Sequence, residues 1–79
     1  MTIGDKIHKA RVDVWSLSVS DLSDLCDVPE DIIVSAEQRH YPNRVQLMKL
    51  CEFLGIDVEW VKQSLVTEAI RRNKYLKEI

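Results

Sequence analysis

The sequence predicts an all-α domain, for three reasons. The chain has 79 residues, which is one domain and lies near the smallest size at which a single hydrophobic core suffices. Its two glycines and two prolines are too few to punctuate a fold of many short strands. Apolar residues recur instead every three or four positions, which places them on one face of a helix. We therefore expect residues 1–79 to form a single unit of long helices with short connections.

The first two helices occupy the N-terminal third of the chain. A first helix is expected over residues 2–12, and residues 15–18 break its pattern. Either Ser18 or Ser20 can cap the second helix, and Asp21 suits its first turn because the helix dipole is positive there. The apolar residues of the first helix are Ile3, Ile7 and Ala10. Those of the second are Leu22, Leu25 and Cys26.

The third helix is expected to begin at Pro29. A proline suits the first turn of a helix, because its missing N–H loses no hydrogen bond there. Glu30 and Asp31 follow in the same electropositive turn. Ile33 and Ala36 are three residues apart, so both should face the core.

Two further helices complete the domain. A loop at residues 39–43 ends in Asn43, which is a good cap for the fourth helix. Gly55 should end that helix, because glycine best tolerates the left-handed conformation found there. Asp57 caps the fifth helix, which we expect over residues 58–78. The apolar stripe of the fourth helix is Leu47, Leu50, Cys51 and Leu54.

Composition and local patterns exclude a membrane-spanning or secreted chain. No apolar run approaches the ~20 residues needed to cross a bilayer. The N-terminus lacks the charged and then apolar stretches of a secretory signal, so a cytoplasmic location is expected. Cys26 and Cys51 lie in helical apolar patterns without partners at metal-ligand spacing. Both are therefore expected to be buried, reduced thiols.

No arrangement of catalytic residues is present. The chain lacks a glycine-rich phosphate loop, an HExxH or CxxC motif, and a spacing that supports a Ser/His/Asp triad. His40 has no ligand partner at metal spacing, and His8 is far away on another helix. We expect neither an enzyme, nor a cofactor, nor a metal site.

Residues 17–37 combine Leu22 and the small Ser23 in one helix with Val28 after a turn and Ile33 in the next helix, and this arrangement resembles the helix-turn-helix of the lambda-repressor and Cro family. That motif has an apolar and then a small residue in its first helix, a branched apolar residue after the turn, and another midway along the recognition helix. The corresponding residues here are Leu22, Ser23, Val28 and Ile33. Residues 42–58 look like the fourth helix of that family, and the resemblance covers residues 3–61. It implies a five-helix lambda-repressor-like domain, with the motif at residues 19–37 and an extended C-terminal helix.

The chain departs from the family pattern where DNA would be contacted. Val19 stands where the family usually has a glutamine that braces against phosphate, and Asp27 stands where the turn usually has glycine. Major-groove readout typically relies on Arg, Lys, Asn or Gln. None of the residues at the reading positions can make the common bidentate contact to guanine: Pro29, Glu30, Asp31, Val34 and Ser35.

The motif is also strongly acidic. Residues 16–38 contain six acids and no lysine or arginine, whereas the whole chain has a net charge of −2. Neutralisation of phosphates supplies most non-specific affinity for DNA, so this segment should repel a duplex. The acids either form an ordinary solvated face or contact a basic protein surface.

The preferred prediction is a transcription regulator that binds another protein. Its partner would be the basic DNA-binding face of another repressor, so the chain would resemble a phage antirepressor that controls a genetic switch. Charge complementarity would speed the encounter and select that partner. Ile32 and Val34 should point at least partly outward, unless one of them packs against a neighbouring helix. The predicted contact residues are Pro29, Glu30, Asp31, Ile32, Val34 and Ser35.

The alternative prediction is a Cro-like repressor that binds operator DNA. A third reading is an adaptor domain that uses the fold only to dimerise. Five residues lie where family members often touch the DNA backbone, namely Arg39, His40, Tyr41, Asn43 and Arg44. The candidate phosphate contacts among them are Arg39, His40, Asn43 and Arg44. Arg39 and Arg44 could equally pair with nearby acids. The end of the C-terminal helix either folds back on the body or supplies a homodimer contact.

Overall fold

The computed structural model describes residues 1–41 and 43–77, with the side chains of residues 1–41 and 43–69. Within these residues it contains five α-helices and one π-helical segment, and no strand. The predicted all-α fold with five helices is confirmed. The elements are α1 Ile3–Lys9, η1 Ala10–Val14, α2 Val19–Cys26, α3 Glu30–Glu37, α4 Arg44–Leu54 and α5 Val58–Lys77.

The helices begin and end at the residues whose side chains suit those positions. Ser18, rather than Ser20, caps α2: its Oγ accepts a hydrogen bond from the Asp21 N–H at 3.0 Å. Gly55 ends α4 in the left-handed region, with φ 78°. The side-chain oxygens of the other two predicted caps also accept backbone N–H groups, and these caps are Asn43 for α4 and Asp57 for α5. The predicted capping pattern is confirmed.

The single helix predicted over residues 2–12 is divided in the structure. After α1 the backbone widens into η1, where the Trp15 N–H donates to the Ala10 carbonyl at 3.0 Å. This bond spans five residues, which is the π-helical spacing. The wider turn directs Arg11 toward the body, where its Nη1 donates to the Leu17 carbonyl at 2.9 Å. The hydrogen bonds of Arg11 thus fix the chain reversal before α2.

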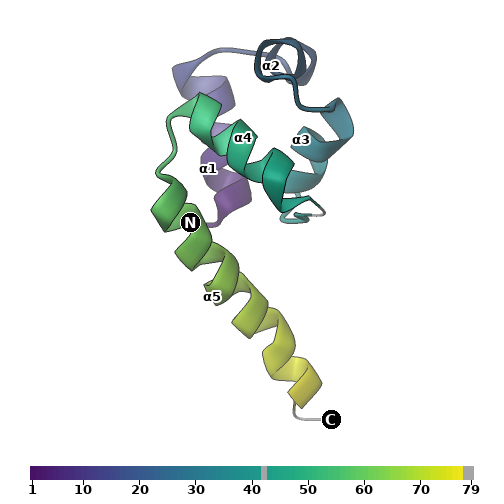
Figure 1. The fold of residues 1–79 in the computed structure, drawn as a ribbon, viewed down its shortest axis with the longest axis vertical. Coiled ribbons are helices and arrows are strands. Elements are labelled where there is room, and N and C mark those ends of the chain that lie inside the picture. Colours follow the sequence, from purple (N-terminus) through teal and green to yellow (C-terminus); the bar gives the residue numbers. More distant parts are fainter. Residues whose placement is uncertain (42, 78–79) are drawn as a thin grey trace.

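The core lies where α1, α2, α3 and α4 meet, and the start of α5 closes it (Figure 1). All the inward positions predicted for α3 and α4 are confirmed, but Leu25 is 59% exposed and does not belong to the core. Cys26 and Cys51 are buried and free, as expected, and burial raises the pKa of the Cys51 thiol to about 12. The buried apolar residues are Ile3, Ile7, Leu22, Cys26, Val28, Ile33, Ala36, Leu47, Leu50, Cys51, Leu54, Ile56 and Val61.

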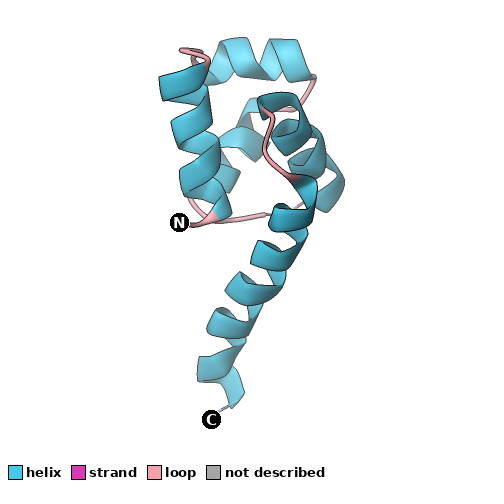
Figure 2. Cartoon of the chain, turned by 90° about the vertical axis from the view of Figure 1, so that its left-hand side faces the viewer, coloured by secondary structure: helices cyan, strands magenta, loops and turns pink. Residues whose placement is uncertain are grey.

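The C-terminal helix packs against the body only with its first turns. Val61 is buried, and Glu68 accepts a hydrogen bond from Tyr41, but the rest of α5 projects away from the other helices (Figures 1 and 2). The helix therefore does not fold back, and the molecule measures 43 × 21 × 20 Å. Its observed bounds match the predicted range to residue 77, and residue 78 lies outside the described residues.

Candidate functional site

The helix α3 is held against the body by the side chains on its inner face. Ile33 and Ala36 are almost completely buried. Pro29 is exposed and is the N-cap residue, with φ −55° and ψ 145°, so it precedes the helix and does not occupy the predicted first-turn position. The outer face of α3 begins with Glu30 and is left open to solvent.

The connection between α2 and α3 is fixed although it lacks glycine. Asp27 takes the left-handed conformation, with φ 57° and ψ 44°, which aspartate tolerates better than most residues. Ser23 Oγ donates to the Val28 carbonyl at 2.6 Å. Lys49 Nζ lies 3.3 Å from both the carbonyl oxygen and Oδ2 of Asp27. These contacts hold the two helices in one relative orientation.

The negative charge predicted from the sequence is displayed at the surface. Glu37 is the exception, because it is half-buried and bonded to η1 and α1. The other five acids of residues 16–38 are exposed: Asp21, Asp24, Asp27, Glu30 and Asp31. Only Asp27 among these five forms a salt bridge to another described residue, its weak contact with Lys49. Four uncompensated carboxylates therefore give the α2–α3 surface a negative potential.

The structure brings three of the predicted contact residues together on the outer stripe of α3. Glu30 and Asp31 are exposed, and Val34, one turn later, is 42% exposed. Ile32 is only partly exposed, because this side chain is half-buried and packs against the core. Ser35 is half-buried at the edge of the same helix. The alternative that one of the two branched residues packs inward thus applies to Ile32.

Leu25 is an exposed apolar residue that the sequence analysis assigned to the core. On a helical wheel, Val19, Leu22 and Cys26 fall within an arc of ~60°, and Leu25 lies ~90° from its centre. Including Val19 in the apolar face of α2 would have revealed this position. Leu25 therefore adds an apolar side chain to the exposed surface of α2, beside the exposed Asp24.

The residues proposed for phosphate contact differ in whether their side chains already form contacts within the molecule. Arg39 Nη2 lies 3.8 Å from Asp5 Oδ1, so the pairing expected for Arg39 is confirmed. The Asn43 side chain is used as the cap of α4, and His40 is exposed. Arg44 forms no salt bridge with any residue the structure describes, so the alternative pairing with a nearby acid is not found for Arg44 among these residues.

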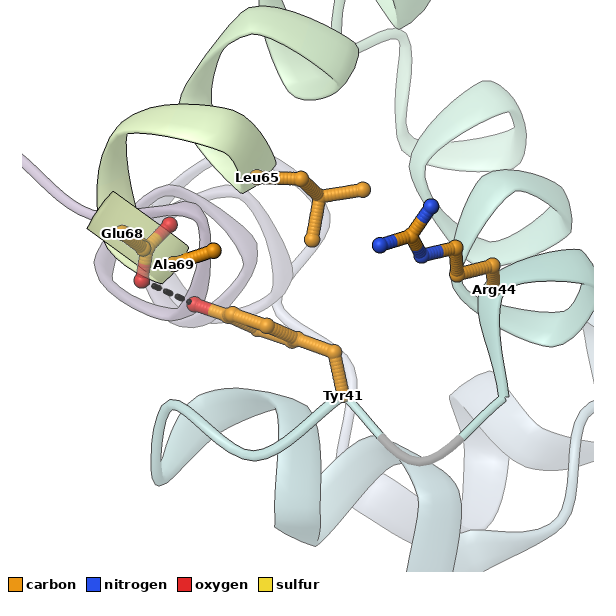
Figure 3. A pocket seen from close by; sticks show the side chains of 5 residues that line it. All are labelled: Tyr41, Arg44, Leu65, Glu68 and Ala69. Carbon is orange, nitrogen blue, oxygen red and sulfur yellow. Dashed lines mark hydrogen bonds between the residues drawn. The ribbon is translucent and has the colours of Figure 1, made fainter. Parts of the chain in front are cut away.

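Arg44 faces a small pocket between the start of α4 and α5 (Figure 3). The pocket has a volume of about 140 Å³, and Tyr41, Leu65, Glu68 and Ala69 form the rest of its lining. Tyr41 Oη accepts the Gly4 N–H at 3.2 Å and donates to Glu68 Oε1 at 2.8 Å. Burial, together with the bond to Glu68, raises the pKa of Tyr41. Tyr41 therefore connects three parts of the chain and positions α5.

Glu37 joins the end of α3 to the N-terminal helices. Its carboxylate accepts hydrogen bonds from Arg11 Nε at 2.9 Å and Arg11 Nη2 at 3.0 Å, and it also contacts His8 Nδ1. Burial alone would raise the pKa of Glu37, but the hydrogen bonds from Arg11 and His8 hold that pKa below its usual value. The bidentate pair fixes the end of α3 that lies away from the acidic stripe.

Stability is expected to fall in acid because of Glu37 and Asp5. The Thr2 hydrogen bonds lower the pKa of Asp5, so both carboxyls have a lower pKa in the folded state than in the unfolded state. The unfolded chain then binds more protons, and the stabilisation present at neutral pH is lost as the pH falls from about 5 towards 3. The urea midpoint of the wild-type protein should decrease as the pH falls across this range. The midpoint of the Glu37→Gln variant should decrease less steeply with pH. A midpoint independent of pH in the wild-type protein would contradict the assignment.

Comparison with known proteins does not place the chain in a family. No protein-family model matches it, and no match was found among curated proteins or solved structures. Within the described part of the chain, no helix is long and apolar enough to cross a membrane, and no three potential metal ligands gather at one place. The function must therefore be argued from the α2–α3 surface itself.

Proposed function

We propose that α2 and α3 form a helix-turn-helix of the lambda-repressor type, and that the chain regulates transcription by binding another regulator. The observation that carries the proposal is the outer stripe of α3, where Glu30, Asp31 and Val34 are exposed and neither carboxylate forms a salt bridge with a described residue. If α3 entered the major groove of DNA as a reading helix, the carboxylates of Glu30 and Asp31 would approach the phosphates and be repelled by them. The same stripe is complementary to the basic DNA-binding face of a repressor.

Binding of this kind would make the chain an antirepressor of a phage-type genetic switch, acting in the cytoplasm. The acids supply steering and selectivity, because opposite potentials speed the encounter and like charges reject other partners. Val34 supplies apolar area within an acidic rim, an arrangement typical of a protein interface. The short connection through Asp27 supports the helix-turn-helix reading, since its left-handed backbone takes over the role of the usual glycine.

The double variant Glu30→Lys/Asp31→Lys tests the proposal. Immobilised protein is incubated with host lysate in the presence of competing genomic DNA fragments, and retained protein and DNA are identified. The wild type should retain a basic repressor-like protein, and the double variant should bind that protein at least about tenfold more weakly. Both residues are exposed, so the helix-dipole penalty should remain near ~1 kcal/mol or less per charge.

The matched control is Asp13→Lys/Glu52→Lys, which makes the same change in net charge at exposed positions outside α2 and α3. It should bind the partner as the wild type does. Equal affinity of the wild type and the α3 double variant would overturn the acidic-face mechanism.

Direct operator binding is the second candidate, because Arg44 has no described salt-bridge partner and lies at the N-terminus of α4. A helix N-terminus and an adjacent arginine can together hold a phosphate. In the same experiment, retention of a discrete DNA fragment that is lost as salt rises would favour this Cro-like function. Homodimer formation through the projecting end of α5 is compatible with either function.

A further inference from the structure

An open groove lies on the side of the molecule away from α3. One wall comes from α1 and η1, and the other from the connection between α4 and α5; its volume is about 540 Å³. Figure 1 shows α3 and the α4–α5 connection on opposite sides of the body. The lining is largely apolar, with lysines at the α1 wall, and consists of Met1, Lys6, Lys9, Ala10, Val14, Leu54, Gly55, Ile56 and Asp57.

Exposed apolar side chains gather on the wall formed by η1. Val14 is 74% exposed in the groove, and Met1 is 73% exposed beside it. Trp15 follows directly, stacked on Phe53 with ring centroids 5.4 Å apart and still 44% exposed. Val14 is the last residue of the π-helical turn and Trp15 is its C-cap residue, and such turns are frequent at functional sites. This wall therefore presents apolar area suited to contact with another protein.

The charge of the groove is opposite to that of α3. Lys6 lies over the Trp60 ring at 4.2 Å, and Lys9 is exposed without a salt bridge to any described residue. The acid in the lining, Asp57, already caps α5 with its Oδ1. The α1 wall thus combines apolar area with positive charge, whereas the outer stripe of α3 combines Val34 with negative charge.

We propose that the groove binds the outer stripe of α3 from a second copy of this chain. In this contact Val34 of one copy meets the apolar wall around Val14 of the other, and Glu30 and Asp31 face Lys9 and Lys6. Because the two surfaces lie on opposite sides of one body, the α3 stripe of a copy cannot reach the groove of the same copy. The interface is therefore head-to-tail, and it extends into chains unless a ring closes.

The proposal uses the same acidic face as the proposed function but does not depend on the external partner. Self-association would cover α3, so the copy that binds a regulator would be one whose α3 has been released. Lys9 is outside the regulator-binding surface. A change from Lys9 to Glu should therefore weaken self-association without removing any regulator contact. Because it releases α3, this variant should bind the regulator at least as tightly as the wild type does.

Purified variants test the contact by sedimentation velocity over a range of protein and salt concentrations. The wild-type protein should show a mass that rises with concentration, and association should weaken about tenfold or more when salt is raised to ~1 M. Lys9→Glu should be monomeric. Lys62→Glu makes the same charge change on α5, outside the groove, and should associate as the wild type does.

Mixing two variants gives the decisive result. Lys9→Glu keeps an intact α3 stripe, and Glu30→Lys/Asp31→Lys keeps an intact groove, so the two variants should associate with each other when mixed, although each variant alone is monomeric. A wild-type protein that stays monomeric at ~1 mM would overturn the proposal. Association that is unaffected by Lys9→Glu, or a mixture that does not associate, would also overturn it. Because no external partner is present, none of these results bears on regulator binding.

Discussion

Gly4→Ala is expected to destabilise the protein by about 2 kcal/mol or more, although alanine is the better helix former. A Cβ added at Gly4 would lie 2.4 Å from the Ala36 carbonyl oxygen and 3.1 Å from the Glu37 carbonyl oxygen. Both are backbone atoms at the end of α3, so α1 would have to move away from α3. That movement would also lengthen the hydrogen bond between the Gly4 N–H and Tyr41.

Thermal and urea unfolding monitored by circular dichroism would measure this effect. For a domain of this size a loss of 2 kcal/mol lowers the melting temperature by roughly 8–16 °C. Gly55→Ala is the informative control, because nothing lies within 4 Å of an added Cβ there and only the left-handed backbone is strained. It should cost about 1 kcal/mol. A Gly4→Ala protein as stable as the wild type would show that α1 and α3 do not approach as described.

Ile33→Ala is expected to reduce the free energy of unfolding by about 2–5 kcal/mol. The Ile33 side chain is fully buried in the core beneath α3, so its truncation leaves a cavity under the helix that carries the acidic stripe. Urea denaturation would give the loss directly. A substantial fraction of the protein could then be unfolded at growth temperature, because total stabilities of small domains are only about 5–15 kcal/mol.

Val34→Ala provides a matched control on the next residue of the same helix. Val34 is 42% exposed, so its truncation should change stability by only about 0.5 kcal/mol. It should instead weaken both contacts proposed for the outer stripe of α3. If the two truncations had equal effects on stability, the assignment of the inner and outer faces of α3 would be wrong.

The helices could be predicted because their determinants are close in sequence. Apolar periodicity and capping residues act within a few positions, so Ser18, Asn43, Gly55 and Asp57 mark helix ends without knowledge of the tertiary fold. The surface charge of α2 and α3 could also be predicted, since a segment with acids and no basic residues cannot neutralise itself.

The features that were missed depend on contacts between distant residues. The π-helical turn places Arg11 against Glu37, 26 positions later, and nothing in the local pattern of residues 2–12 specifies that contact. Gly4 did leave a signal, because a glycine inside a helical pattern often marks a close approach of another backbone. Which element approached it could be known only from the packing of α1 on α3.

In the candidate site, too, some features could be predicted from local sequence and others depend on contacts between distant residues. Exposure of Glu30 and Asp31 follows from their place in the first turn of an amphipathic helix. Arg39 and Arg44 are indistinguishable in sequence, yet one lies near Asp5 and the other faces the pocket beside α5. That difference arises from the left-handed backbone of Arg39, with φ 68°, and from the position of Arg44 at the start of α4.

The projecting α5 has a consequence for solution experiments. The radius of gyration is 12.9 Å, whereas a compact chain of this length would have one of ~11.6 Å. The molecule should elute earlier from a sizing column than its 9.2 kDa mass implies, and it should tumble anisotropically. Helix α5 runs obliquely down the length of the molecule (Figure 1), and amide N–H bonds lie close to the axis of their helix, so the transverse nuclear relaxation of the α5 amides should be faster than average. An apparent mass of ~1.3 times the true mass by elution volume, or fast relaxation confined to α5, is therefore what a single copy should show.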